Sequence, residues 1–406
     1  MLILPAALLG PMAPNATAQL RYPPARQDTQ VDDYFGTPVA DPYRWLEDVD
    51  ASETRSWIDA ENALSFAYLG AIPEREAIRQ RLTALWDYPR FGTPFKKRGL
   101  YFFFKNDGLQ NQSVLYRQAA RTASPTVVLD PNTLSADGTV ALSTLDLSED
   151  ARYLAYATAV SGSDWNEIHV RDVTAAHDLP DRVRWVKFSG ISWTHDHAGF
   201  FYSRYPTPAD ENPLLAVNRF HRLHYHRLGT EQSADRLVFE RLDQPDWGVG
   251  GDVTEDGRYL ILNLWLGTDR RNRVYYADLK DAVHPDLGAA PVKLLDAFDA
   301  SYSFVTNDGP VFYFRTDLDA PRGRLIAIDI RHSEPQHWRE VIPQAEDVLE
   351  SVVLVHGTFV TTYLHDAHSR LRLYGIDGSA RGEITLPAIG TASELSTESA
   401  RDSELF

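Results

Sequence analysis

A serine nucleophile is the first chemistry to look for in this sequence. Nucleophiles of the strand-to-helix elbow type lie in Gly-x-Ser-x-Gly, and an acid and a His follow further along the chain. The nearest string is Gly190-Ile191-Ser192-Trp193-Thr194, which lacks the second Gly and lies among β-forming residues. We interpret Ser192 as an ordinary strand residue and place no catalytic residue in this chain.

A histidine cluster raises the question of a metal site. His224 and His226 would share one face of a strand, as two metal ligands could, and His221 lies close by in the sequence. Arg219 and Arg222 would oppose a cation, and no further His or carboxylate is adjacent. We therefore predict that the chain binds no metal.

Several carboxylates and histidines could serve acid and base chemistry or a proton relay. Each of them coincides with a small polar turn ahead of a β-forming run, where polar side chains are expected in any case. We interpret the following as turn residues and solvated loop charges: Asp146, Glu149, Asp150, Glu255, Asp256 and His195-Asp196-His197.

The composition is that of a globular protein. The chain has 406 residues, of which 43% are hydrophobic and 24% charged, so it can bury a sizeable core. A formal net charge of -17 would repel a phosphate backbone, so we expect no nucleic-acid partner. With no cysteine, the chain has no disulfide, thiolate metal site or cysteine nucleophile.

The first 18 residues resemble a signal peptide. Residues 2–9 are largely apolar, and Ala16-Thr17-Ala18 fits the A-x-A pattern of a signal-peptidase site. We predict a periplasmic or secreted protein. The alternative is a disordered tail on a cytoplasmic one, because no positive side chain precedes Arg21. Prolines interrupt the apolar run, so we expect neither a transmembrane helix nor a membrane partner.

Residues 19–88 are predicted to form a helical segment. Trp57, Ala60, Leu64 and Tyr68 recur at helical spacing, and Ser52 is placed to cap that helix. A second helix should follow, with a proline and acidic residues in its first turn, an apolar stripe, and a proline beyond its end: Pro73, Glu74, Glu76, Ile78, Leu82, Leu85, Trp86 and Pro89.

Residues 89–406 show a β pattern with an internal repeat. Short runs rich in Val, Ile, Tyr, Phe and Trp alternate with polar turns, and a turn ahead of an apolar strand recurs seven times, near residues 99, 151, 198, 257, 309, 357 and 402. A period of about 40 to 50 residues is typical of propeller blades. We therefore predict an all-β fold with seven blades; the alternative is two stacked sandwiches.

A family resemblance rests on stretches spread along the whole chain. Asp41-Pro42-Tyr43-Arg44-Trp45-Leu46-Glu47-Asp48 resembles the opening signature of prolyl oligopeptidases, which are proline-specific serine peptidases combining an α/β-hydrolase domain with a β-propeller. Further stretches resemble the family in its order and spacing, at residues 108–112, 114–116, 161–165, 186–188, 193–196, 225–230, 255–259 and 363–366.

The resemblance implies a seven-bladed β-propeller with an incomplete last blade, preceded by an α-helical segment of an α/β-hydrolase domain whose body is missing. The complete protein would cleave short proline-containing peptides after proline by serine chemistry, without a cofactor. The propeller would act as a size filter. We expect this chain alone to be inactive, and to be monomeric unless its exposed helices associate.

Four residues correspond to propeller positions near the substrate cavity of that family: Val170, Gly248, Trp265 and Thr268. Their identities mostly depart from those common in the family, which has an aromatic residue at Val170, a longer apolar side chain at Gly248 and a cationic one at Trp265. The alternative for each is a strand packing residue.

A second function class is a stand-alone propeller that binds a peptide or protein without catalysis. The helical segment argues against it, because its apolar faces would need a hydrolase core to cover them. Micromolar peptide binding by the isolated chain would favour this second class.

Overall fold

The computed structural model describes residues 20–208 and 217–406. The predicted signal peptide, residues 1–18, lies outside the described residues. The chain divides into two compact units, Met1–Asp87 and Tyr88–Phe406. None of the helices in the described part is long and apolar enough to cross a membrane.

The first unit contains a small hairpin and the two predicted helices. Its elements are β1 (Val31–Tyr34), β2 (Thr37–Ala40), the short 3-10 helix η1 (Arg44–Glu47), α1 (Ser52–Gly70) and α2 (Arg75–Trp86). Trp45 and Trp57 pack edge to face, with ring centroids 6.5 Å apart, and the Thr54 hydroxyl donates to the Trp45 carbonyl at 3.0 Å. These contacts fix η1 against α1.

Both helices begin at residues other than those predicted. Ser52 is the first residue of α1, and Ala51 at the N-cap position supplies no side-chain hydrogen bond, so the prediction of a Ser52 cap is wrong. Instead, the Asp48 carboxylate accepts the N–H groups of Asp50 and Ala51 just ahead of the helix. Pro73 lies two residues before α2 and not in its first turn.

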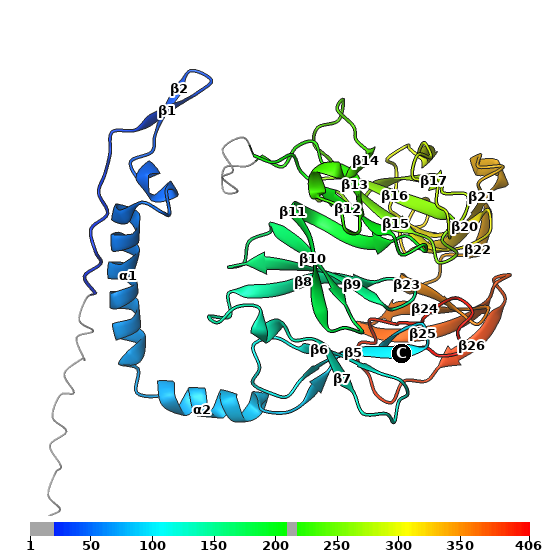
Figure 1. The fold of residues 1–406 in the computed structure, drawn as a ribbon, viewed down its shortest axis with the longest axis horizontal. Coiled ribbons are helices and arrows are strands. Elements are labelled where there is room, and N and C mark those ends of the chain that lie inside the picture. Colours follow the sequence, from blue (N-terminus) through cyan, green and yellow to red (C-terminus); the bar gives the residue numbers. More distant parts are fainter. Residues whose placement is uncertain (1–19, 209–216) are drawn as a thin grey trace, which may run out of the picture. The chain divides into compact units, whose positions relative to one another are not determined.

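The second unit consists of consecutive antiparallel groups of strands, which we call blades 1 to 6 (Figure 1). Blade 1 has β3 (Arg90–Phe91), β4 (Phe95–Lys97), β5 (Leu100–Asn106), β6 (Val114–Gln118) and β7 (Thr126–Leu129). Blade 2 has β8 (Val140–Leu147), β9 (Tyr153–Val160), β10 (Asn166–Asp172) and the first part of β11 (His177–Trp193). Blade 3 has the rest of β11, β12 (Gly199–Arg204), β13 (Arg222–Arg227) and β14 (Arg236–Phe239).

The remaining blades have four strands each. Blade 4 has β15 (Trp247–Val253), β16 (Tyr259–Leu266), β17 (Asn272–Asp278) and β18 (Val292–Leu295). Blade 5 has β19 (Tyr302–Asp308), β20 (Val311–Thr316), β21 (Arg324–Asp329) and β22 (Arg339–Ile342). Blade 6 has β23 (Val348–Val355), β24 (Thr358–His365), β25 (His368–Gly375) and β26 (Ala380–Ile384).

The long strand β11 belongs to two blades. Its early residues pair with β10 and its late residues with β12, and Val186 is opposite Asn166 in the first ladder and Arg204 in the second. Trp185 and Phe188 have positive φ angles of 60° and 53°, a conformation that bulky residues rarely adopt. These two residues mark the place where the strand passes from blade 2 to blade 3.

The blades follow one another around a common centre, which confirms the predicted all-β propeller fold (Figure 1). Six of the seven predicted turns occupy equivalent places, between the first and second strands of blades 2 to 6 and, in blade 1, between β4 and β5. At the seventh, the structure assigns no strand, but Ser396 and Phe406 exchange two backbone hydrogen bonds of 3.0 and 2.8 Å, as an antiparallel pair does. The count of seven stays a prediction.

The core lies between the blades because neighbouring residues of a strand point to opposite faces. On β9, Leu154 packs in a cluster with Phe102 of blade 1, whereas Ala155 packs in a cluster with Phe200 of blade 3. All four side chains are fully buried. Blade 2 is therefore held by apolar contacts on both sides.

Side chains hold the last residues of the chain against blade 1. The Lys96 ammonium lies 2.8 Å from the Asp402 carboxylate and 3.1 Å from that of Glu404. The Tyr101 hydroxyl donates to Glu404 at 2.8 Å, and its ring packs edge to face on Phe406. In Figure 1, the C-terminus accordingly lies beside β5.

Candidate functional site

A cavity of about 380 Å³ lies where the first strands of the blades converge. Its lining comes from those strands, from the turns that follow them and from the C-terminal segment: Lys97, Asp146, Leu147, Glu149, Ser192, Trp193, His195, Val253, Thr254, Glu255, Val305, Thr306, Val352, Val353, Leu354 and residues 397–400. We call it the central cavity. It is the candidate functional site because every blade contributes to it.

Three successive blades contribute through the same type of turn, with the spacing Ser/Thr-x-Asp. The turns are Ser148-Glu149-Asp150, Thr194-His195-Asp196 and Thr254-Glu255-Asp256. In each, the hydroxyl donates to the Asp carboxylate, at 2.7, 2.6 and 2.6 Å respectively. The backbone N–H of each Ser or Thr also bonds a carbonyl five residues later. The middle residue takes no part in these turn contacts, and in all three turns it lines the central cavity.

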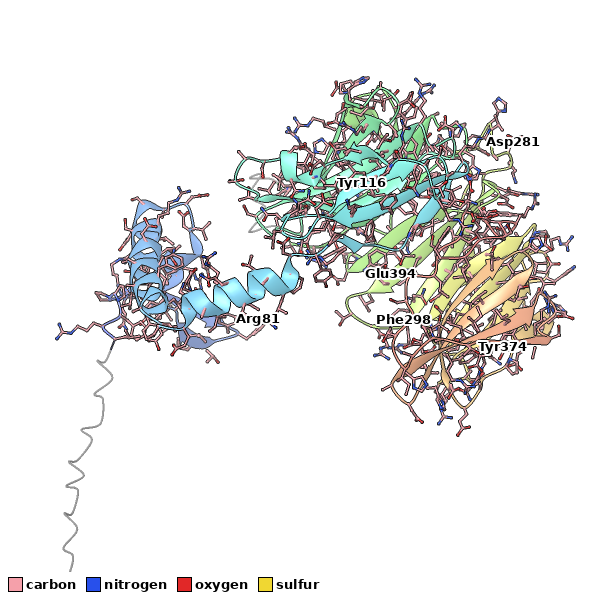
Figure 2. All side chains as sticks on the ribbon, turned by 90° about the horizontal axis from the view of Figure 1, so that it is seen from below. Arg81, Tyr116, Asp281, Phe298, Tyr374 and Glu394 are labelled. Carbon is pink, nitrogen blue, oxygen red and sulfur yellow. The ribbon has the colours of Figure 1, made fainter. Side chains whose placement is uncertain are left out.

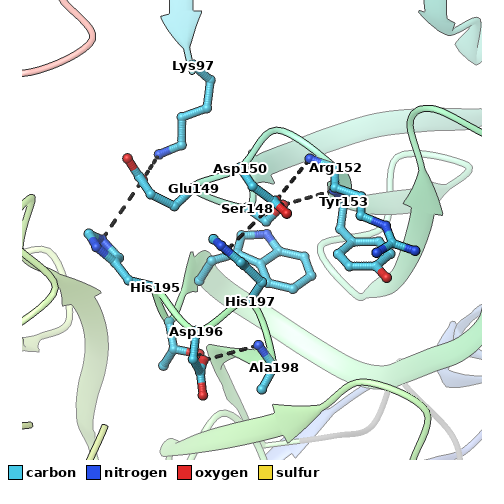
Figure 3. A network of polar contacts seen from close by, with 12 residues as sticks. Lys97, Ser148, Glu149, Asp150, Arg152, Tyr153, His195, Asp196, His197 and Ala198 are labelled. Atoms are coloured by element: carbon cyan, nitrogen blue, oxygen red, sulfur yellow. Dashed lines mark hydrogen bonds and ion pairs between the residues drawn. The ribbon is translucent and has the colours of Figure 1, made fainter. Parts of the chain in front are cut away.

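Lys97 and Glu149 form an ion pair at the cavity, with Lys97 Nζ 2.6 Å from Glu149 Oε2 (Figure 3). The Nε2 atom of His195 lies 3.9 Å from the same oxygen. Burial lowers the pKa of His195 more than the Glu149 charge raises it, so the imidazole is neutral at pH 7. The three side chains come from blades 1, 2 and 3 and lie across one side of the cavity.

Acidic groups dominate the rest of the lining. Burial raises the pKa of Asp146 to about 6, although the Lys97 charge and the N–H groups of Leu147 and Trp193 oppose that rise. Burial also raises the pKa of Glu255, whose carboxylate accepts the Ala400 N–H at 2.7 Å. A carboxyl group with a pKa near 6 means that the charge of the cavity changes just below neutral pH.

The four residues expected near a substrate cavity lie at different places. Val170, on β10, is 1% exposed and belongs to the core between blades 2 and 3. Gly248 and Trp265 are opposite one another in the ladder of β15 and β16, and a Cβ at position 248 would lie 2.1 Å from the indole Cε2. Thr268 follows in the exposed turn after β16. Their role at a substrate stays a prediction.

Gly248 and Trp265 are at the end of β15 and β16 that is farther from the Glu255 turn. Trp265 lines a second cavity, of about 480 Å³, between blades 4 and 5. We call it the blade 4–5 cleft. The structure thus brings two of the four predicted residues together, at a site separate from the central cavity.

Ser192, His221 and His226 have hydrogen-bond partners within the fold, and His224 stacks on the Tyr202 ring. The Ser192 hydroxyl accepts the Val253 N–H at 2.9 Å, which links blade 3 to blade 4. His221 bonds the Lys187 carbonyl and the Val249 N–H, at 2.9 and 3.1 Å. Within residues 20–208 and 217–406, no three His, Cys, Asp or Glu side chains are grouped so as to hold a metal ion.

His226 lies between two buried carboxylates. Its Nδ1 is 2.7 Å from Asp235 Oδ1 and its Nε2 is 3.1 Å from Asp181 Oδ1, and all three side chains are at most 2% exposed. The Tyr202 hydroxyl donates to Asp235 at 2.7 Å, and the Gly229 N–H donates to Asp181 at 2.6 Å. We call these three groups the His226 cluster.

Sequence reasoning missed the position of the middle turn residues at the central cavity. Glu149, His195 and Glu255 were interpreted only as turn polarity, whereas the structure places all three on the central cavity. The repeated Ser/Thr-x-Asp spacing was the available signal, because it puts the three side chains at equivalent places in successive blades. Figure 2 shows how many polar side chains cover the same unit, which is why charge alone did not single them out.

The family follows from a model that covers most of the chain. Residues 23–406 match the family described as prolyl oligopeptidase, N-terminal beta-propeller domain. The chain belongs to the prolyl oligopeptidase family. The matching region contains every blade and both cavities, and the motifs that suggested the resemblance all lie within it.

Relatives and solved structures agree with this membership. The chain is 38% identical to a prolyl endopeptidase of Elizabethkingia miricola over 92% of its length and 52% of the relative, and 33% identical to the dual function macrocyclase-peptidase POPB of Amanita bisporigera over 95% and 56%. Prolyl oligopeptidase B from Galerina marginata, solved with a 25mer macrocyclization substrate, is 31% identical, with a TM-score of 0.83 over 95% of this chain and 56% of that one. The chain spans about half the length of these relatives.

Proposed function

We propose that this chain is the propeller portion of a serine endopeptidase that cleaves short peptides after proline, and that its central cavity admits those peptides by size. The cavity at the centre of the blades carries this proposal. At about 380 Å³ it is far too small for a folded domain, so only an extended chain can enter it. Peptide-bond cleavage itself requires a nucleophile, a base and an oxyanion hole.

A reporter thiol tests the size filter. The natural chain has no cysteine, so Val353→Cys places one thiol on the central cavity, at a half-buried side chain outside the packed clusters between blades. Ala290→Cys, in the exposed loop before β18, is the matched control. We expect iodoacetamide to label both variants, and a maleimide on a 5 kDa polymer to label Val353→Cys at least about 100-fold more slowly than Ala290→Cys.

Equal polymer labelling of the two thiols would overturn the size filter. The Lys97 and Glu149 pair should contribute to the barrier, because it links blades 1 and 2 at the cavity. Adding Lys97→Ala to Val353→Cys should therefore speed labelling by reagents of peptide size, while labelling of Ala290→Cys stays unchanged.

The catalytic half of the proposal has its own test. We expect the purified 406-residue chain not to hydrolyse a chromogenic Gly-Pro substrate above the rate in buffer. Cleavage by this chain that a serine reagent abolishes would contradict the proposal and would mean that it contains a nucleophile. Peptide binding measured by calorimetry should be weaker than micromolar, whereas a stand-alone binding module requires micromolar affinity.

We further propose that residues 1–18 direct export and are removed, on the evidence of the A-x-A pattern at Ala16-Thr17-Ala18. N-terminal sequencing of the protein from its native host should then give Gln19 as the first residue. Retention of Met1 would contradict export.

A further inference from the structure

A third cavity, of about 550 Å³, lies on blade 2, and we call it the blade 2 pocket. Its lining includes three aromatic side chains, those of Tyr156, Trp165 and Trp185. Trp165 and Trp185 pack edge to face, with ring centroids 5.5 Å apart and ring planes at 83° to each other. The two indoles therefore form a corner with flat apolar walls, of the kind that ligand pockets commonly have.

A β-bulge in β11 brings Trp185 to this pocket. Val183 and Val186 both pack in the core between blades 2 and 3, although they are an odd number of positions apart and regular alternation would put them on opposite faces. A shift of register against β10 and the positive φ of Trp185, 60°, accommodate the extra residue. Bulges commonly redirect a side chain in this way. The strand thus departs from its regular pleat at the residue that forms one wall of the pocket.

The Trp185 indole offers a hydrogen-bond donor as well as an apolar ring. Within the part of the chain that the structure describes, its N–H makes no hydrogen bond. A proline-rich segment in its extended helical form has no internal hydrogen bonds, so its carbonyls are available to such a donor. Grooves lined by aromatic residues suit these segments, because the extended form is already ordered before it binds.

Two arginines at the pocket share one carboxylate. Arg182 Nε lies 2.8 Å from Glu167 Oε1, and Arg184 Nε lies 3.1 Å from Glu167 Oε2. The side chains of Arg182 and Arg184 are 56% and 62% exposed, so a ligand can reach both guanidinium groups. One carboxylate cannot balance both charges.

The other ionisable groups of the lining do not remove this excess. Asp178 pairs with Arg171 at 2.9 Å and also accepts the Tyr156 hydroxyl at 3.2 Å. Burial lowers the pKa of His169, so its imidazole is neutral at pH 7. The pocket is therefore locally cationic on a chain whose formal net charge is -17, and it favours a ligand that carries a carboxylate.

We propose that the blade 2 pocket binds a proline-containing peptide segment with an acidic residue beside its prolines. The proline rings lie in the corner of Trp165 and Trp185, a peptide carbonyl accepts the Trp185 N–H, and the carboxylate pairs with Arg184. This inference rests on the proposed function in taking proline-containing peptides as the ligand. It adds a second place on the propeller, separate from the central cavity, at which such peptides are held.

Fluorine NMR of the full chain labelled with 5-fluorotryptophan tests the proposal. The chain has nine tryptophans, and the resonance lost in Trp185→Phe identifies the reporter in the pocket. The probes are acetyl-Pro-Pro-Glu-amide, acetyl-Pro-Pro-Gln-amide and acetyl-Ala-Ala-Glu-amide. We expect the first peptide to shift the Trp185 resonance at a concentration about fivefold lower than the Gln peptide needs and about tenfold lower than the alanine peptide needs.

An arginine variant decides whether Arg184 reads the carboxylate. Arg184→Gln should abolish the preference for Glu over Gln and should keep the preference for proline over alanine. Arg339→Gln is the matched control, at an exposed arginine on β22, the last strand of blade 5, and it should retain both preferences. The other eight fluorine resonances report whether each variant keeps its fold.

Equal responses to the Glu and Gln peptides, or to the proline and alanine peptides, would overturn the proposal. A preference for Glu that survives Arg184→Gln would also overturn it, and so would a Trp185 resonance that no peptide moves. The proposed function would not fail with it, because the Val353→Cys labelling reports on the central cavity, whose lining shares no residue with the blade 2 pocket. Fast polymer labelling of Val353→Cys would refute the size filter and leave the Trp185 response unchanged.

Discussion

Replacing His226 by Gln should remove a pH-dependent contribution to the stability of the propeller. Burial by itself would lower the pKa of the His226 imidazole, but hydrogen bonds to Asp181 and Asp235 outweigh it and raise the pKa to about 9. Burial would likewise raise the pKa of Asp181, and the bonds from His226 and Gly229 hold it below its usual value. His226 is therefore a buried imidazolium between two carboxylates at neutral pH.

The size of the effect follows from the two proton affinities. Raising the pKa from 6.5 to about 9 is worth about 3 kcal/mol, since each tenfold change in affinity contributes about 1.4 kcal/mol. The protonated form is the stabilising one. This contribution is therefore fully present below pH 6.5 and is lost as the pH rises through 9. Replacing His226 also leaves two buried carboxylates without a counterion. This increases the loss of folding free energy at pH 6, where the wild-type imidazole is charged.

Urea unfolding followed by tryptophan fluorescence measures this contribution. Between pH 6 and pH 9.5, the difference in free energy of unfolding between wild type and His226→Gln should shrink by about 3 kcal/mol. His224→Gln is the matched control, because burial lowers the pKa of His224 to about 4 and the folded protein keeps it neutral throughout this range. Only the unfolded chain titrates His224 here, so the difference between wild type and His224→Gln should change by less than about 1 kcal/mol and should grow, not shrink, as the pH rises. A difference for His226→Gln that does not shrink between pH 6 and pH 9.5 would refute the reasoning.

Three further changes test the packing. Lys96→Met should lower the thermal midpoint by a few degrees in scanning fluorimetry, because it leaves the carboxylates around Lys96 without their cation. Gly248→Ala should shift the tryptophan emission by displacing the Trp265 indole, and adding Trp265→Ala should relieve the clash. Gly378→Ala should destabilise blade 6 in urea by more than Gly357→Ala: both glycines have positive φ angles, but only at position 378 would the Cβ meet a carbonyl of β22, at 1.9 Å.

The fold was predictable because its determinants are local. Each Asp-Gly or similar turn precedes a β-forming run, so six of the seven turns could be placed by spacing alone. The start of α1 was harder to predict from the sequence, because Ser52 is of the residue type that usually caps a helix. In the structure Asp48, four positions earlier, accepts the N–H groups of Asp50 and Ala51 instead. Side chains that approach only in the folded chain, such as Lys97 and Glu149, could not be paired from the sequence, because they are far apart along it and each also fits a solvated loop.

The Ser/Thr-x-Asp turns explain how the fold and the central cavity share one segment. The hydroxyl and the carboxylate satisfy each other and the turn backbone, so folding constrains the first and third positions. The side chain at the middle position makes none of these bonds and lines the central cavity. In successive blades this residue is Glu149, His195 and Glu255. A residue that the turn does not need can change its charge without loss of the turn. The central cavity can therefore acquire its acidic character independently of the propeller that encloses it.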